Sequence, residues 1–344
     1  MRTRTSLILA AAGAAVLALG IVFGTQPGGQ TQEAARGRLA FPDLVPRLAD
    51  ARTIEITHKG ATLRLDRGAA GAAEWGIATR DDYPAQPGKA HALLANLTEL
   101  RLDEPRTSDA AFYARLGVAD PGKDADSTLL RVLDGKGGVI AALIVGHARA
   151  AQAGGVDTVY VRRPNAAQSW LADGKLAPST EVADWLDRDV VNIPAADVTG
   201  DVVTRDGVTL TFGRTGETFA LTAPADHPKL EYYKVQEVAD ALSGLSMEDV
   251  RRAPAPGKPL GRFVVTTKAG QVITADVSKD GAAIWATFAI GGQAAASLDR
   301  RLKGWAYEIG SWKEQALVPT LADLKAAEPA PVAPAPAASA APAK

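Results

Sequence analysis

The chain has 344 residues, a formal net charge of −1 at pH 7 and no cysteine. The lack of cysteine excludes disulfides, iron–sulfur clusters, cysteine-ligated zinc, thiol nucleophiles and a lipoprotein anchor. Because positive and negative charges nearly cancel and alternate along the chain, we expect no surface for nucleic acid or acidic lipid.

An unbroken apolar run, SLILAAAGAAVLALGIVF at residues 6–23, follows Arg2 and Arg4. A spanning helix needs about 20 mostly apolar residues, and positive charges mark its cytoplasmic side. We therefore predict a cytoplasmic tip and transmembrane anchor at residues 1–25, a linker at residues 26–39, and a main domain in the periplasm, held at the bacterial inner membrane. The alternative is a cleaved signal peptide, whose apolar core is about 7 to 15 residues.

Beyond the linker the sequence repeats itself once. Residues 53–67 and 201–214 each alternate apolar and polar positions around a glycine-containing turn, which is typical of a β-hairpin. Leu63 in the first hairpin matches Leu210 in the second at an offset of 147. Each hairpin is followed by a short predicted strand with a large aromatic residue, EWGIA in the first half and TFALT in the second.

A helix is predicted next in each half, at residues 87–100 and 235–245, because apolar residues recur there every three to four positions. Strand, glycine turn and strand then follow at residues 129–146 and 261–278. Residues around the two helices match at a constant offset of 145: Lys89, Leu97, Leu100 and Arg106 against Lys234, Leu242, Leu245 and Arg251.

These patterns predict an α+β fold with two tandem repeats of antiparallel sheet and packed helices, preceded by one N-terminal transmembrane helix. We place the first repeat at residues 40–194 and the second at residues 195–325. Trp-containing segments at residues 181–191 and 300–317 are predicted to be helical. Residues 326–344, rich in Pro and Ala, predict a disordered, extended tail that is either only solvated or reaches toward the cell wall or a partner.

A search for chemistry finds no catalytic motif, cofactor signature or metal-ligand spacing. We therefore predict no catalytic, cofactor-binding or metal residues, and the binding residues stay unassigned. The segment DGKGG at residues 134–138 lacks phosphate-loop spacing and predicts a hairpin turn. The acidic pairs Asp81-Asp82, Asp103-Glu104 and Asp187 with Asp189 are interpreted as cap and turn residues, not as facing carboxylates for hydrolysis. The histidines are too widely spaced to suggest a metal site: His58, His91, His147 and His227.

Aromatic and basic residues leave two alternatives open. Most tryptophans are predicted to lie in the core, and one or two could instead form a sugar-binding platform: Trp75, Trp170, Trp185, Trp285, Trp305 and Trp312. Lys89, Lys234, Tyr83 and Tyr233 recur at the start of the helix in both halves. We interpret these four as packing and solvation residues, with binding as the alternative.

Several longer stretches, above all FYARLGVADP and DWLDRDVVNIP, resemble the bacterial domain of unknown function 4340 family over about residues 40–325. RVLDGKGGVIAALIVG and VYVRRP add to the resemblance. It implies an anchored, exported protein associated with ABC transporters of the gliding-motility type, and hence an inner-membrane protein partner. It supplies no catalytic residues.

The sequence favours a non-enzymatic binding or accessory ectodomain of an ABC-type transporter or envelope complex, for which open sheet edges would offer strand addition to a partner. The alternative is a periplasmic enzyme that acts on envelope polysaccharide or peptide, and a third reading is a structural spacer. Asymmetry between the repeats distinguishes an enzyme from a binding protein, because an active site concentrates unusual polar residues in one copy. The matched positions are mostly apolar or conservative, which favours binding.

Overall fold

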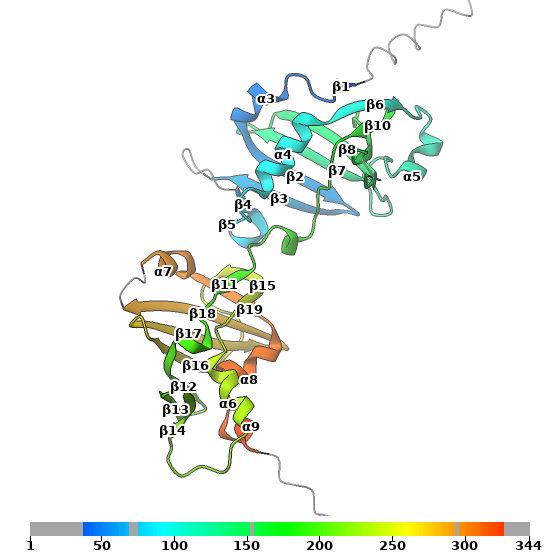
Figure 1. Cartoon of the computed structure of the whole chain (residues 1–344). Helices are drawn as coiled ribbons and strands as arrows, with labels where there is room; N and C mark the ends of the chain where they lie inside the picture. Colours follow the sequence, from blue (N-terminus) through cyan, green and yellow to red (C-terminus); the bar gives the residue numbers. More distant parts are fainter. Residues whose placement is uncertain (1–36, 69–74, 152–154, 293–295, 327–344) are drawn as a thin grey trace, which may run out of the picture. The chain divides into compact units, whose positions relative to one another are not determined.

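The computed structural model describes residues 37–68, 75–151, 155–292 and 296–326. The chain divides into two compact units, Met1–Asp187 and Arg188–Lys344, each built on one antiparallel sheet (Figure 1). The predicted anchor at residues 6–23 lies outside the described residues, as does the predicted tail beyond residue 326. In the described ranges, no helix is long and apolar enough to cross a bilayer.

The first unit has a ten-stranded sheet with the spatial order β1-β6-β10-β9-β8-β7-β2-β3-β4-β5. Its strands are β1 (Arg38–Leu39), β2 (Ala51–His58), β3 (Ala61–Arg67), β4 (Trp75–Ile77), β5 (Tyr83–Pro84), β6 (Arg101–Pro105), β7 (Thr128–Asp134), β8 (Val139–Arg149), β9 (Thr158–Arg162) and β10 (Ser169–Asp173). The helices are α3 (Leu44–Arg47), α4 (Lys89–Glu99) and α5 (Tyr113–Leu116), with the 3-10 turns η1 (Leu48–Asp50), η2 (Ala78–Arg80), η3 (Ala110–Phe112) and η4 (Val182–Asp184).

The second unit has a nine-stranded sheet with the order β11-β15-β19-β18-β17-β16-β12-β13-β14. Its strands are β11 (Asp189–Val191), β12 (Val198–Arg205), β13 (Val208–Thr215), β14 (Thr218–Ala223), β15 (Leu245–Arg252), β16 (Lys258–Thr267), β17 (Gln271–Asp280), β18 (Ala283–Gly292) and β19 (Trp305–Ile309). The helices are α6 (Tyr232–Ala239), α7 (Ala296–Leu302), α8 (Glu314–Leu317) and α9 (Leu321–Leu324), with η5 (Ala195–Asp197) and η6 (Ser311–Lys313).

The two sheets share one topology. The strands correspond one to one in spatial order. The order β1-β6-β10-β9-β8-β7-β2-β3-β4 in the first sheet matches β11-β15-β19-β18-β17-β16-β12-β13-β14 in the second. Helix α4 lies between β4 and β6 along the chain, and α6 lies between their counterparts β14 and β15. This shared order supports an internal duplication of an α+β module. Among the described strands, β5 of the first unit has no counterpart in the second.

The predicted hairpins form in both units with the same turn. Lys59 and Gly60 join β2 to β3 with φ values of 48° and 81°, and Asp206 and Gly207 join β12 to β13 with φ values of 51° and 77°. Two consecutive positive φ values are what a two-residue type I′ turn requires. The alternation predicted from the sequence then places every second side chain of these strands in the core.

The helices agree with the sequence prediction only in part. Helix α4 buries Leu93, Leu94 and Leu97, as expected from their spacing. Helix α6 ends at Ala239, earlier than predicted, and Leu245 is the first residue of β15. Gly244 follows the turn with a φ of 53°, a conformation that ends helices. The apolar spacing in the sequence extends beyond the end of the helix, because the residues of the following turn also pack on the core.

A second difference concerns residues 300–317, which were predicted to be helical. Residues 305–309 instead form β19, which lies between β15 and β18 inside the sheet. Four of its five residues are buried, Glu308 being the exception. A strand that is covered on both faces loses the alternation of apolar and polar positions, so periodicity alone could not distinguish it from a helix.

The repeat boundary also lies earlier in the chain than we placed it. Residues 188–194 were assigned to the first repeat, but the structure places them with the second unit. The reason is β11, which pairs with β15 at Asp189↔Ser246, while the Arg188 guanidinium donates to the Met247 carbonyl at 2.9 Å.

Each unit closes in the same way at its C-terminal end. In the first, Ala85 pairs with Leu186, and in the second, Leu230 pairs with Lys325. Beside these bridges the Nζ atoms of Lys89 and Lys234 donate to the backbone carbonyls of Asp184 and Asp323. The matched lysines thus tie the start of a helix to the end of its own unit, which agrees with the packing interpretation.

Candidate functional site

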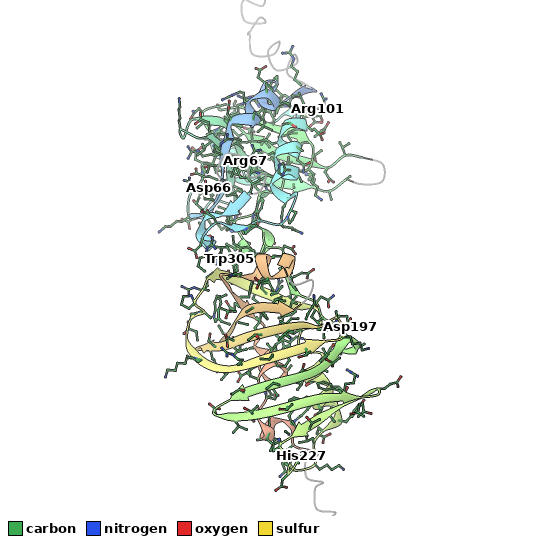
Figure 2. The ribbon with its side chains drawn as sticks, turned by 90° about the vertical axis from the view of Figure 1, so that its left-hand side faces the viewer. Asp66, Arg67, Arg101, Asp197, His227 and Trp305 are labelled. Carbon is green, nitrogen blue, oxygen red and sulfur yellow. The ribbon has the colours of Figure 1, made fainter. Side chains whose placement is uncertain are left out.

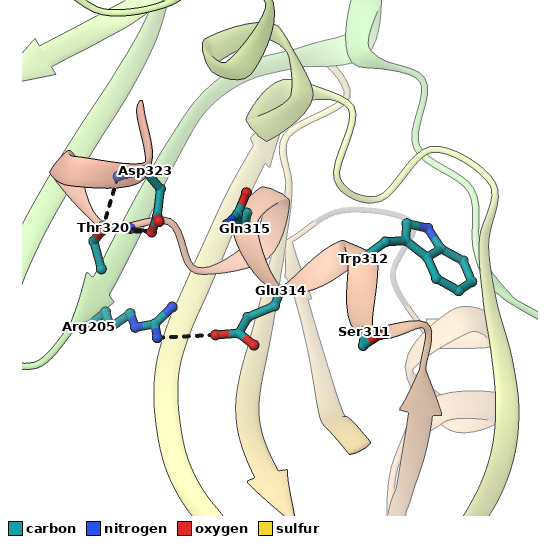
Figure 3. Close-up of a pocket in the computed structure, with 7 residues that line it drawn as sticks. All are labelled: Arg205, Ser311, Trp312, Glu314, Gln315, Thr320 and Asp323. Carbon is teal, nitrogen blue, oxygen red and sulfur yellow. Dashed lines mark hydrogen bonds and ion pairs between the residues drawn. The ribbon is translucent and has the colours of Figure 1, made fainter. Parts of the chain in front are cut away.

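A hollow of about 560 Å³ lies in the surface of the second unit. Arg205 at the end of β12 forms one side of it, and η6, α8 and α9 with its N-cap form the rest. Figure 3 shows the lining residues: Arg205, Ser311, Trp312, Glu314, Gln315, Thr320 and Asp323. Most of these side chains are polar, and the hollow is open to solvent on one side.

An ionic network fixes the wall near β12. Arg205 donates from Nη2 to Glu314 at 3.2 Å and from Nη1 to the Val318 carbonyl at 2.8 Å. Lys279 donates to the other oxygen of Glu314 at 2.7 Å. Burial by itself raises the pKa of Glu314, but the hydrogen bonds and charges of Lys279 and Arg205 outweigh it, so the pKa is lowered. Glu314 is therefore a fixed, ionised acceptor.

The second carboxylate of the hollow belongs to the cap of α9. Asp323 accepts hydrogen bonds from the backbone and the hydroxyl of Thr320 at 2.8 and 2.6 Å, which completes a capping box. Burial raises the pKa of Asp323, and the bonds from Thr320 more than offset this, so its pKa is lowered. A glycosidase acid needs a raised pKa, and neither Glu314 nor Asp323 has one. Both carboxylates of the hollow are therefore ionised hydrogen-bond acceptors.

Trp312 forms an exposed platform at the edge of the hollow. Its side chain is 69% exposed, and its six-membered ring lies so close to Gly310 that a Cβ on this glycine would be 2.0 Å from Cζ3 and Cη2. The lack of a side chain at Gly310 thus allows the ring to rest on the backbone. Next to it, the Ser311 hydroxyl and the Gln315 amide are exposed and make no hydrogen bond within the described part of the chain.

The first unit has no equivalent hollow among its described residues. The position of Arg205 is taken there by His58, at the same offset of 147 that relates the hairpins. His58 uses Nδ1 to contact the Ser127 carbonyl at 3.1 Å. The segment after β10 contains only η4, so Glu314 and its helix have no counterpart. The asymmetry expected of a functional site therefore lies in the second repeat.

Asp201 is a second asymmetric residue, inside the core. It is 1% exposed, and neither carboxylate oxygen has a hydrogen-bond partner. Its neighbours on β13 and β16 are Phe212 and Val265. Burial raises its pKa to about 8, although the charge of Arg214 lowers it somewhat. At the same offset of 147, the first repeat has Ile54 at this position.

The histidines and acidic pairs are dispersed. Within the described ranges there is no group of three or more His, Asp or Glu residues that could hold a metal ion. His91 lies on α4 and His147 on β8. His227 lies in the loop after β14, and Figure 2 labels it. Asp81 and Asp82 occupy a turn with φ values of 54° and 59°, as their interpretation as turn residues requires. The segment at 134–138 is a hairpin turn, in which the Asp134 carboxylate accepts from two backbone N–H groups at 2.8 Å.

The tryptophans are mostly in the core, as predicted. Trp75, Trp185, Trp285 and Trp305 are buried, Trp170 is half-buried, and Trp312 is exposed. The matched tyrosines differ in exposure: Tyr83 is buried in β5, whereas Tyr233 is 57% exposed on α6. Tyr83 closes a sheet edge, a role that its sequence context did not reveal.

Sequence reasoning missed Asp201, Arg205 and Glu314. The sequence contains a signal for Asp201, because the alignment of the hairpins matches it with Ile54, at a strand position where the other residues are apolar. Arg205 lies in the turn region of its hairpin, where a polar residue is unremarkable. Glu314 carried no signal, because its contacts with Arg205 and Lys279 join residues that are 109 and 35 positions apart.

Comparison with known proteins gives one match. The model of the family described as Domain of unknown function (DUF4340) matches residues 75–262, more than half of the chain. The matched range includes Asp201 and Arg205, whereas the rest of the hollow lies beyond it. No curated protein and no solved structure matches.

Proposed function

The chain belongs to the DUF4340 family, and on this premise we propose that it is a non-enzymatic, membrane-anchored binding protein of the bacterial envelope. Residues 1–25 anchor it in the inner membrane, and both units lie in the periplasm. The second repeat binds a saccharide segment of an envelope polymer on Trp312. The chain serves as an accessory ectodomain of an ABC-type transporter or envelope complex.

The exposed ring of Trp312 carries this proposal. The ring is 69% exposed, lies against the Gly310 backbone and borders the polar hollow, so it presents a flat apolar face to solvent beside hydrogen-bonding groups. A pyranose ring offers an apolar C–H face to an indole and hydroxyl groups at its rim. Ser311 and Gln315 supply donors and acceptors beside the ring, and the open hollow admits a section of a longer chain.

We expect Trp312→Ala to weaken binding of isolated envelope polysaccharide by about tenfold or more, which corresponds to about 1.4 kcal/mol. Gly310→Ala should have an effect in the same direction, because the new Cβ displaces the ring. The φ of −55° at Gly310 suits alanine, so the fold is kept. The measurement is co-sedimentation of the full-length protein in detergent with the polysaccharide.

Tyr232→Ala is the matched control, because Tyr232 is also 69% exposed but does not line the hollow. Its binding should equal that of the unchanged protein. Equal binding by Trp312→Ala would contradict the saccharide site. New reducing ends in the polysaccharide would instead support the alternative, a periplasmic hydrolase.

The accessory role has its own test. Crosslinking of the full-length protein in native membranes, followed by purification, should recover transporter subunits, and a variant lacking residues 1–25 should not recover them. Recovery of transporter subunits by both proteins would show that the interaction does not need the anchor. Recovery of no protein partner would leave only the saccharide-binding part of the proposal.

A further inference from the structure

One sheet edge differs between the two repeats. In the first sheet, β4 is covered by β5 through the pairs Gly76↔Pro84 and Ile77↔Tyr83. In the second sheet, β14 stands at the position of β4 and is the last strand. The residues before α6 do not return to it: Lys229 accepts from the Ala326 backbone, and Glu231 donates to the Leu324 carbonyl.

The backbone groups at this edge show what is missing. In the first repeat, the carbonyls of Trp75 and Ile77 accept from the N–H groups of Ala85 and Asp82 at 2.7 and 3.1 Å. The matched residues, at an offset of 144, are Phe219 and Leu221. The Phe219 carbonyl accepts from the side chain of Gln236 at 3.0 Å, and the Leu221 carbonyl has no partner among the described residues.

The register of the hairpin explains why these groups point outward. Residues 216–217 form a two-residue turn, so Thr215 and Thr218 are the pair that exchanges hydrogen bonds. The next such pair is Gly213 and Ala220. The backbone groups of Phe219 and Leu221 therefore face away from β13, toward the open edge.

Strand β14 also lacks the features that protect exposed edges. Its sequence, TFALTA, contains neither a charged residue nor proline, whereas edge strands are commonly guarded by both. Its six residues offer a longer template than the two that pair in β4 and β5. An uncharged edge on which the Leu221 carbonyl has no partner among the described residues, and the Phe219 carbonyl is held only by a side-chain amide, is suited to strand addition.

We propose that the open edge of β14 receives an extended segment of a partner protein as an additional antiparallel strand. The first repeat shows the chemistry of the occupant: β5 runs antiparallel to β4 and buries Tyr83 beside it. The partner strand accordingly carries a large apolar side chain opposite Leu221. The chain's own tail does not fit, because five prolines in residues 327–344 would interrupt a ladder. The proposal does not depend on the saccharide site.

The test uses a photoreactive residue at Thr218, Ala220 or Thr222 of the full-length protein in cells, one position at a time. These side chains are exposed along β14. Crosslinked partner residues should shift by about two positions for each step along β14, in the opposite direction, because an antiparallel strand keeps this register.

A closed variant, in which residues 222–229 are replaced by residues 78–84, gives the second repeat the strand that it lacks. It should lose the crosslinks from Thr218 and Ala220, which lie outside the replaced segment, and a Gly/Ser replacement of the same seven-residue length should keep them. Urea unfolding of both variants should match that of the unchanged protein, which shows that they fold and keeps this result independent of the Trp312 site. Crosslinks to β14 of a second copy, crosslinks without the register shift, no crosslinks at the open edge, or crosslinks that persist in the closed variant would each overturn the proposal.

Discussion

Asp201→Asn is expected to raise the free energy of unfolding of the second unit by several kcal/mol at pH 8 and to change it little at pH 4. Asparagine has the same size and cannot ionise, so it removes the cost of a buried charge while keeping the buried polar group. At high pH the carboxylate of Asp201 must be charged among Phe212 and Val265 without a hydrogen bond, which is costly.

The sign follows from the raised pKa. The native Asp201 carboxyl has a pKa of about 8 against an ordinary value of 3.8, so the native state binds the proton more tightly than the unfolded state. The unchanged protein therefore keeps its full stability below about pH 4 and loses it as the pH rises to about 8. The full loss is on the order of 5 kcal/mol, at about 1.4 kcal/mol per pH unit.

Urea unfolding of the full chain at several pH values measures this effect. Asp226→Asn is the control, because Asp226 is an exposed acid of the same unit and should not alter the pH dependence. Asp201→Val removes the polar group as well, so it should stabilise the unit at both pH values. A stability that is independent of pH between 4 and 8, or that rises with pH, would refute the assignment.

Local patterns predicted those parts of the fold that depend on neighbours in sequence. The two hairpins, helix α4 and the repeat itself could be predicted because alternation, glycine turns and a constant offset are local signals. Strand β19 could not, since it is covered on both faces and has lost its alternation. The early boundary depends on the pairing of β11 with β15, which joins residues more than 50 positions apart.

The candidate site was hidden for a related reason. Trp312 was recognised as a possible platform together with five other tryptophans, and the packing against Gly310 that distinguishes it is a tertiary contact. The Arg205–Glu314 pair joins two distant segments. No local pattern singles out Asp201, although the repeat itself contains the comparison with Ile54 that marks it as unusual.

Arg162→Met is expected to destabilise the first unit by about 2 to 4 kcal/mol, the opposite sign to Asp201→Asn, because the buried guanidinium satisfies backbone carbonyls that the substitution leaves without a donor. Arg162 is 4% exposed. It donates to the carbonyls of Val118 and Ala166 at 2.9 and 3.1 Å and forms an ion pair with Asp120. Its guanidinium also lies 4.4 Å from the ring centre of Tyr113. Methionine fills the space of the stem and leaves these acceptors without a donor.

Urea unfolding of the full chain measures the loss, and Arg262→Met is the control. Arg262 pairs with Asp276 at 2.6 Å, but both side chains are more than half exposed, so its loss should cost about 1 kcal/mol or less. Equal effects of the two substitutions would show that Arg162 is not a structural centre of the first unit.

The contacts of Arg162 also explain what two stretches that carry the family resemblance do in the fold. Arg162 belongs to VYVRRP, and its partners Tyr113, Val118 and Asp120 belong to FYARLGVADP. Tyr113 and Val118 pack with Tyr160 in one buried cluster. The Arg162 guanidinium therefore connects the two stretches, and it holds α5 and the loop after it against β9. If this is their role, Arg162→Met should expose residues 113–120 to hydrogen exchange while saccharide binding by the second unit stays unchanged.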